Sequence, residues 1–149
     1  MKILFVCLGN ICRSPMAEAV MKKKAIEAGL NLHIESAGTN RYHKGGPADE
    51  RTIKICLDNG VDLRSHIARR FRTADFSEFD KIVCLADEVA EEMNEFITHP
   101  KQWEKVTRLE VGDPWYGGEK EFIQCFKHIE QVCEMLLQKF SDHQNLLPK

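Results

Sequence analysis

The feature that most constrains this chain is a run near its N-terminus, Val6-Cys7-Leu8-Gly9-Asn10-Ile11-Cys12-Arg13-Ser14. The apolar residues Ile3 to Val6 lead into it, and such a short apolar run is typical of a buried strand. Pro15 follows it and opens an amphipathic segment, as expected in the first turn of a helix. The sequence therefore predicts a strand, then a tight loop that contains a thiol and an arginine, then a helix.

This order of elements points to phosphate chemistry at Cys7. A thiol at a strand-to-helix turn faces the free N–H groups of the helix, and these groups and the helix dipole favour a thiolate. The same N–H groups can hold an oxyanion such as phosphate, and Arg13 adds a planar fork of donors for two phosphate oxygens. A nucleophilic sulfur beneath a phosphate cradle predicts phosphoryl transfer through Cys7. The alternative is a buried cysteine at a strand end, followed by a solvated arginine.

The loop does not fit the common nucleotide-binding phosphate loop. That loop has the pattern Gly-x4-Gly-Lys-Ser/Thr, in which a lysine reaches the phosphates. Here an arginine, Arg13, stands directly before Ser14, and the second glycine is missing. We therefore exclude a nucleotide-binding loop of this type.

Length and charge narrow the class of protein further. A chain of 149 residues is expected to form one domain with a substantial core. The formal net charge of −2 and the lack of a long basic tract argue against a nucleic-acid partner. No apolar run is long enough to span a membrane, and the N-terminal run is too short for a signal peptide. Six cysteines are too sparse for a disulfide scaffold, so we expect a cytoplasmic protein.

Strand-like and helix-like segments alternate along the chain. We expect strands at residues 3–6, 32–37, 80–86 and 106–109. We expect helices that begin near Pro15, after the loop 39–47, at Asp87 and near Glu119. In the second of these, Ile53, Cys56 and Leu57 are expected to face inward, and Gly60 ends it. This alternation predicts an α/β fold with a parallel sheet covered on both faces, in which ligands bind beyond the carboxyl ends of the strands. Residues 141–149 are expected to form a frayed tail.

A second candidate group lies in the loop Gly112-Asp113-Pro114-Trp115-Tyr116-Gly117-Gly118. Transfer of a phosphoryl group to sulfur needs an acid that protonates the leaving oxygen, and Asp113 can supply the proton. Pro114 disfavours helix at the residue before it, while Trp115 and Tyr116 can line a slot for an aromatic ring. The alternative is a turn in which Asp113 caps the last helix.

With these motifs the chain resembles the low-molecular-weight protein tyrosine phosphatases over nearly its whole length. The matching motifs are Val6 to Pro15, Ser36-Ala37-Gly38-Thr39, and Asp113-Pro114-Trp115-Tyr116-Gly117. The resemblance implies a single domain, residues 1–149, with a four-stranded parallel sheet and a phosphate-binding loop after the first strand. It implies hydrolysis of phosphotyrosine in protein substrates through a cysteinyl-phosphate, without a metal or other cofactor.

The resemblance also implies roles for individual residues. Cys7 matches the nucleophile, Arg13 the phosphate clamp and Asp113 the general acid. A hydrogen-bond network that supports the loop is implied for Asn10, Ser14, Ser36 and His66. Substrate binding is expected at Leu8, Gly9, Asn10, Ile11, Cys12, Ser14, Tyr42, Trp115 and Tyr116.

A few positions of the family pattern need comment. Cys12 matches a second loop cysteine that in relatives forms a reversible disulfide with the nucleophile under oxidation. Tyr42 stands where many relatives have tryptophan, and Trp115 stands where many have tyrosine, so the shape of the aromatic cleft is left open. Leu85-Ala86-Asp87 stands where many relatives have Met-Asp directly, which leaves the role of that aspartate open.

Three other functions are alternatives to this one. A thioredoxin-linked arsenate reductase shares the fold and loop but needs a closely spaced cysteine pair near residues 80–90, where only Cys84 is present. An arginine-phosphate phosphatase of the same family carries threonine where Ile11 stands, and the bulkier aliphatic side chain favours phosphotyrosine. A metal-binding module built on Cys7 and Cys12 lacks the second ligand pair that structural zinc requires.

Overall fold

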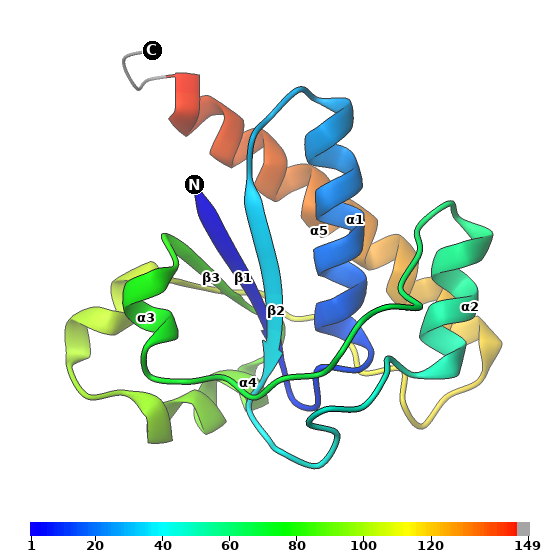
Figure 1. Ribbon diagram of the computed structural model, residues 1–149, viewed down its shortest axis with the longest axis horizontal. Coiled ribbons are helices and arrows are strands. Elements are labelled where there is room, and N and C mark those ends of the chain that lie inside the picture. The colour runs from blue at the N-terminus through cyan, green and yellow to red at the C-terminus, as the bar shows by residue number, and fades with distance from the viewer. Residues whose placement is uncertain (146–149) are drawn as a thin grey trace.

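The computed structural model describes residues 1–145 (Figure 1). The strands are β1 (Lys2–Cys7), β2 (His33–Gly38), β3 (Lys81–Cys84) and β4 (Val106–Arg108). The α-helices are α1 (Arg13–Glu27), α2 (Glu50–Asp58), α3 (Asp75–Glu78), α4 (Asp87–Met93) and α5 (Glu119–Asn145). Two short 3-10 helices, η1 (Asn94–Phe96) and η2 (Pro100–Lys105), lie between α4 and β4.

The four strands form one parallel sheet in the order β2-β1-β3-β4. The chain leaves the central strand β1 toward β2 on one side and later returns to β3 on the other side. Such a reversal of strand order opens a crevice at the carboxyl ends of the two strands, which is where ligands bind in open α/β sheets. Cys7 is the last residue of β1 and therefore lies at this crevice.

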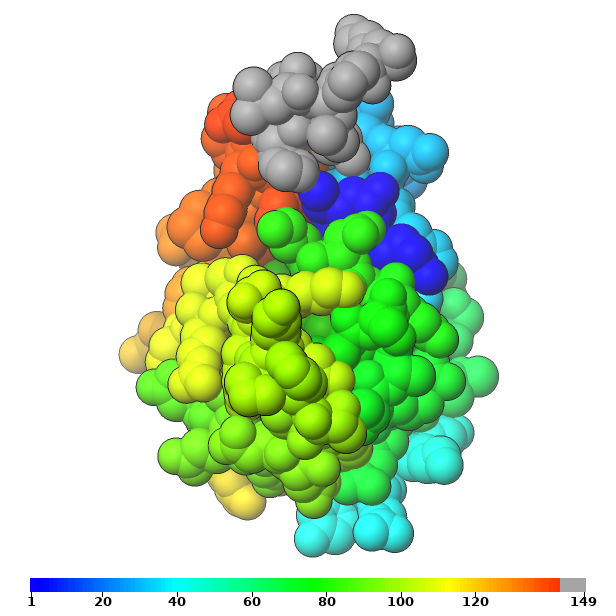
Figure 2. All heavy atoms as spheres, turned by 90° about the vertical axis from the view of Figure 1, so that its left-hand side faces the viewer, coloured from blue at the N-terminus to red at the C-terminus, as the bar shows by residue number. Residues whose placement is uncertain are grey.

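Alternate residues of β1 enter two different hydrophobic clusters. Ile3 and Phe5 pack with α1 and α5, whereas Leu4 and Val6 pack with the segments that contain α3 and α4. This alternation is the period of two expected of a strand covered on both faces. Figure 1 shows α1 and α5 on one side of the sheet, and Figure 2 shows the other side covered by the chain between α3 and β4. The predicted α/β fold with a four-stranded parallel sheet is confirmed.

Two details differ from the sequence prediction. The Leu57 side chain is 42% exposed, so the expectation that it faces inward is wrong. The helix α2 is short and buries the narrow stripe that contains Cys56, and a neighbouring residue on a helix points about 100° away. The expected tail also begins too early, because α5 continues past the buried Phe140 to Asn145. Residues 146–149 of that expected tail lie outside the described residues.

One finding bears on membrane association. Among the helices of residues 1–145, none combines the length and the apolar character needed to cross a bilayer.

Candidate active site

The loop between β1 and α1 opens onto a pocket of about 310 Å³. This pocket lies at the carboxyl end of β1, where the strand order places the crevice. It is lined by Cys7, Leu8, Gly9, Ile11, Cys12, Arg13, Asn40, His43, Glu88, Asp113, Trp115 and Tyr116. The structure thus brings Cys7, Arg13 and Asp113 together, although they come from β1, α1 and the loop before α5.

The sulfur of Cys7 lies against the first turn of α1. Cys7 Sγ is 2.9 Å from the hydroxyl oxygen of Ser14, and the side-chain amide of Asn10 donates a 2.8 Å hydrogen bond to that same oxygen. Because the Ser14 oxygen accepts from Asn10, its own proton is left for two acceptors within reach, the Cys7 sulfur at 2.9 Å and the Ala37 carbonyl oxygen at 3.3 Å. A donor at this distance stabilises negative charge on sulfur, as does the adjacent N-terminus of α1.

Asn10 holds the loop in an uncommon conformation. Its φ of 58° lies in the left-handed region, and among the described residues no other non-glycine residue has a positive φ. Its side-chain amide also donates to Ser36 Oγ at 2.9 Å, and its side-chain oxygen accepts from the Arg69 backbone N–H at 2.9 Å. The His66 Nε2–H donates to the Asn10 carbonyl oxygen at 2.8 Å. These bonds hold the buried residue against the strain of its backbone.

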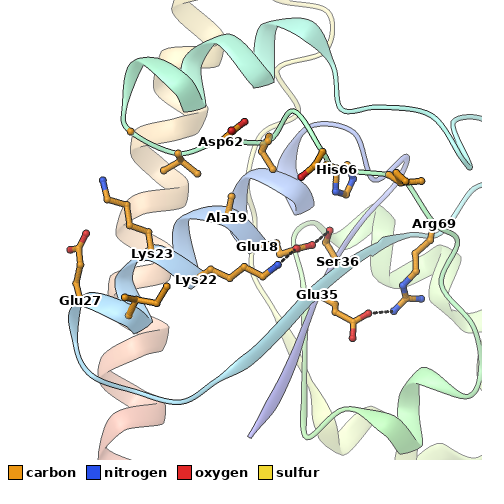
Figure 3. A pocket seen from close by; sticks show the side chains of 16 residues that line it. Glu18, Ala19, Lys22, Lys23, Glu27, Glu35, Ser36, Asp62, His66 and Arg69 are labelled. Carbon is orange, nitrogen blue, oxygen red and sulfur yellow. Dashed lines mark hydrogen bonds and ion pairs between the residues drawn. The ribbon is translucent and has the colours of Figure 1, made fainter.

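Sequence reasoning did not identify Glu18, which extends this network. Ser36 Oγ donates to a Glu18 carboxylate oxygen at 2.6 Å, and Lys22 pairs with the other oxygen at 2.5 Å (Figure 3). Glu18 lies one helical turn after Ser14 on α1, and this spacing is the signal that places it on the same helix face. Ser36, His66 and Glu18 also line a second pocket of about 710 Å³, which is the pocket drawn in Figure 3.

Arg13 is the buried cation of the first pocket. The residue is 2% exposed, and its Nη1 donates to the Val111 carbonyl oxygen at 3.1 Å. Its Nη2 lies 3.6 Å from an Asp113 carboxylate oxygen and 3.6 Å from a Glu88 carboxylate oxygen. The guanidinium is therefore oriented by the protein, with one edge directed at the acidic groups of the pocket.

Asp113 does not cap α5. Its carboxylate accepts a 3.1 Å hydrogen bond from the Trp115 backbone N–H, whereas the Gly118 N–H before α5 donates to Glu121. The helix-cap alternative for Asp113 is therefore wrong. The turn at Asp113 keeps its second carboxylate oxygen turned toward Arg13.

The mouth of the pocket differs in part from the prediction. The Tyr42 side chain is 85% exposed and borders a separate hollow with Arg70 and Glu95, so it does not line this pocket. The next residue, His43, takes this place, with its ring centroid 5.7 Å from that of Trp115. Neighbouring side chains in an irregular loop point in different directions, and a motif match does not specify which one turns inward.

Other predicted binding residues lie behind the loop. Asn10 and Ser14 are fully buried and do not line the pocket, so their contribution is through the loop itself. Sequence reasoning missed Asn40, His43 and Glu88, which do line it. The first two follow β2 and the third follows β3, the two neighbours of β1 in the sheet. Knowledge of the strand order is the signal that could have found them.

All six cysteines are buried, and none is in a disulfide. Burial raises the pKa of Cys12 to about 12, and it likewise raises the pKa of Cys56, Cys125 and Cys133 to about 12. Burial also raises the pKa of Cys84, whose thiol donates to the Ala86 carbonyl oxygen in the interior. With their pKa raised in this way, these thiols are protonated at neutral pH. Within residues 1–145, no three His, Cys, Asp or Glu side chains converge as a metal site.

Comparison with known proteins adds an independent line of evidence. Residues 2–146 match the family described as low molecular weight phosphotyrosine protein phosphatase. The chain is 34% identical to the protein of that name from Schizosaccharomyces pombe, across 94% of this chain and 97% of that protein. It is 37% identical to the low molecular weight protein-tyrosine-phosphatase of Streptomyces coelicolor, across 91% of each.

Solved structures are similar to this chain over nearly its whole length. A protein tyrosine phosphatase from Entamoeba histolytica is similar with a TM-score of 0.90 and 38% identity, covering 97% of this chain and 99% of that one. An arginine phosphatase from Drosophila is similar with a TM-score of 0.86 and 28% identity, covering 94% of this chain and 98% of that one.

Proposed function

The chain belongs to the low molecular weight phosphotyrosine protein phosphatase family, and on this premise we propose that it hydrolyses phosphotyrosine in proteins with Cys7 as nucleophile. The observation that carries the proposal is the convergence of Cys7, Arg13 and Asp113 in one pocket. These are the three groups that the reaction needs, namely a nucleophile, an anion clamp and a proton donor.

In the first step the Cys7 thiolate attacks phosphorus while Asp113 gives a proton to the leaving phenol oxygen. The S–P bond forms as the P–O bond breaks, and the products are the dephosphorylated tyrosine residue of the substrate protein and a cysteinyl-phosphate. The N–H groups at the start of α1 and the Arg13 guanidinium hold the equatorial oxygens. Because Arg13 is already bound to Val111, little reorientation is needed when substrate arrives.

In the second step water attacks the phosphorus of the cysteinyl-phosphate. Asp113, now a carboxylate, takes a proton from that water, the S–P bond breaks, and inorganic phosphate is released. The Ser14 hydroxyl, 2.9 Å from the sulfur, stabilises the departing thiolate. Asp113 has regained its proton from the water, so the enzyme returns to its starting state once phosphate leaves.

The walls of the pocket support an aryl phosphate as substrate. Trp115, Tyr116 and Ile11 are among the residues that line it, and these side chains suit the faces of a phenol ring. Ile11 offers no side-chain hydrogen-bond partner to a guanidinium, which argues against an arginine phosphate. We therefore place phosphotyrosine ahead of phosphoarginine as the substrate.

We also propose a cytoplasmic location. The six cysteines are unpaired thiols, which is the usual state in a reducing compartment. Cell fractionation, with the phosphatase followed by antibody, tests this.

The test of the activity is hydrolysis of an aryl phosphate and of a phosphotyrosine peptide by purified protein in the presence of a chelator. Wild type is expected to turn over both, and Cys7→Ser neither, because a serine hydroxyl has no accessible anion at neutral pH. Cys56→Ser, which changes a buried thiol that does not line the pocket, is the matched control and should retain turnover. Rapid acid quenching and mass spectrometry should locate the phosphoryl group on Cys7. Equal turnover by Cys7→Ser, or faster hydrolysis of a phosphoarginine peptide, would overturn the assignment.

A further inference from the structure

The guanidinium of Arg13 is flanked by two carboxylates, and the mechanism uses only one of them. Asp113 is the proton donor, but Glu88 lies equally close, with 3.6 Å between its Oε1 and Arg13 Nη2. Glu88 stands in the first turn of α4, lines the pocket, and has a side chain that is 58% exposed. Glu88 therefore lines the pocket, but the proposed mechanism gives it no role.

Glu88 is not needed to hold Arg13 in place. The Arg13 side chain is buried, and Nη1 donates to the Val111 carbonyl oxygen. A distance of 3.6 Å is too long for a hydrogen bond, so the contact with Glu88 is a charge interaction only. The Nη2 edge is the one turned toward the acidic groups of the pocket, and a phosphate bound there meets the negative charge of Glu88.

Two other carboxylates of α4 and η1 have cationic or hydrogen-bonding partners of their own. Glu92 accepts a hydrogen bond from Thr39, and Glu95 pairs with Arg70 at 2.6 Å. In the described part of the chain, Arg13 is the only cation paired with Glu88. When substrate phosphate takes Arg13, Glu88 therefore loses its partner while remaining next to the phosphoester.

We propose that Glu88 is a specificity-determining residue that competes with substrate phosphate for Arg13 unless a cation on the substrate pairs with it. A lysine or arginine next to phosphotyrosine can reach the exposed Glu88 carboxylate, whereas an acidic neighbour is repelled by it. The inference rests on the proposed function. It narrows the substrate class to phosphotyrosine with a basic residue on one side, namely the side of the bound peptide that lies next to α4. Exposed pairs of this kind change affinity by about two- to fivefold, and the effect weakens with salt.

The test uses Glu88→Gln and the matched control Glu91→Gln. Glu91 lies one turn further along α4, is exposed, and does not line the pocket, so both variants change the net charge equally. Peptides with Lys, Gln or Glu on either side of phosphotyrosine are compared through kcat and KM. Wild type and Glu91→Gln should prefer Lys over Glu on one side by about two- to fivefold, mainly in KM, and Glu88→Gln should lose most of that preference.

A second measurement does not depend on turnover. Binding of inorganic phosphate, followed by calorimetry, should be tighter in Glu88→Gln than in Glu91→Gln by about two- to fivefold at low salt. Weaker phosphate binding in Glu88→Gln would show that Glu88 holds Arg13 in place, and this would overturn the proposal. An unchanged peptide preference in Glu88→Gln would overturn it equally. Failure of the proposed function has a different signature, because wild type would then hydrolyse no phosphotyrosine peptide at all.

Discussion

The side-chain amide of Asn10 donates a 2.8 Å hydrogen bond to Ser14 Oγ, the same oxygen that lies 2.9 Å from the sulfur of Cys7. One buried residue thus fixes the backbone of the phosphate loop and orients the hydroxyl that faces the nucleophile. The conformation and the side-chain contacts of Asn10 can be separated by substitution, because glycine tolerates a φ of 58° and alanine does not.

Asn10→Ala and Asn10→Gly are expected to differ in stability but not in activity. Each leaves buried partners unpaired, which costs about 1–3 kcal/mol, and alanine adds about 1 kcal/mol of backbone strain. The free energy of unfolding, measured with urea, should therefore be about 1 kcal/mol higher for Asn10→Gly than for Asn10→Ala. Both should lose about ten- to hundredfold in kcat, since neither orients Ser14. Recovery of wild-type kcat in Asn10→Gly would show that the side chain serves the backbone conformation alone.

Arg13→Lys is expected to lose nearly as much activity as Arg13→Ala. Lysine keeps the charge but cannot bond Val111 and two phosphate oxygens at once, since it lacks the planar fork. We expect kcat/KM for an aryl phosphate to fall by on the order of hundredfold or more in both variants. Substantial activity in Arg13→Lys would mean that neutralisation of charge, and not bidentate geometry, is what the site requires.

Cys7 is expected to be the one cysteine that iodoacetamide modifies rapidly in the folded protein near neutral pH. Both Cys7 and Cys12 line the pocket, but the Cys7 sulfur lies 2.9 Å from the Ser14 hydroxyl in the first turn of α1, whereas burial raises the pKa of the Cys12 thiol to about 12. Inorganic phosphate should protect Cys7, because both reagents need the same cradle. Peptide mapping after brief exposure checks this, with denatured protein as the control in which all six cysteines react. Modification that phosphate does not slow would contradict the cradle.

The buried thiols also predict a loss of stability in alkali. Burial raises the pKa of Cys133 from 9.0 to about 12, so the unfolded chain releases this proton at lower pH than the folded chain. Its contribution to the free energy of unfolding is complete below pH 9 and is lost as the pH rises toward 12. In this window Cys133→Ala should reduce the slope of stability against pH by about 1.4 kcal/mol per unit. Urea unfolding at several pH values measures the slope, and an unchanged slope would refute the assignment.

The sequence predicts the core of the site because its key features are local. The order of strand, Cys7, glycine turn and Arg13 is written in adjacent residues, and Pro114 marks the turn that holds Asp113. The other residues that line the pocket are placed by the sheet order β2-β1-β3-β4, and the alternation of strands and helices does not specify this order.

The missed and misassigned residues have three different causes. Glu88 enters the pocket because β3 pairs with β1, and a pattern within α4 cannot reveal that pairing. His43 replaces Tyr42 because side-chain direction in the loop after β2 follows local backbone turns that have no periodicity. The exposure of Leu57 is not predicted because α2 is short. A helix with so few turns has too few apolar residues to define its inward face.

Asp113→Asn is expected to slow aryl phosphates in proportion to the basicity of their leaving groups. A weakly basic phenolate departs without a proton, whereas tyrosine needs one, so the loss on phosphotyrosine should be on the order of 10²–10⁴-fold and much smaller for an activated aryl phosphate. The amide keeps the turn through its oxygen, which can still accept from the Trp115 N–H, so the unfolding midpoint should change little. A kcat series over several phenols, with Cys7 alkylation as the control for an intact cradle, checks the pattern. Equal slowing across the series, together with a fall in melting temperature, would reassign Asp113 to a structural role.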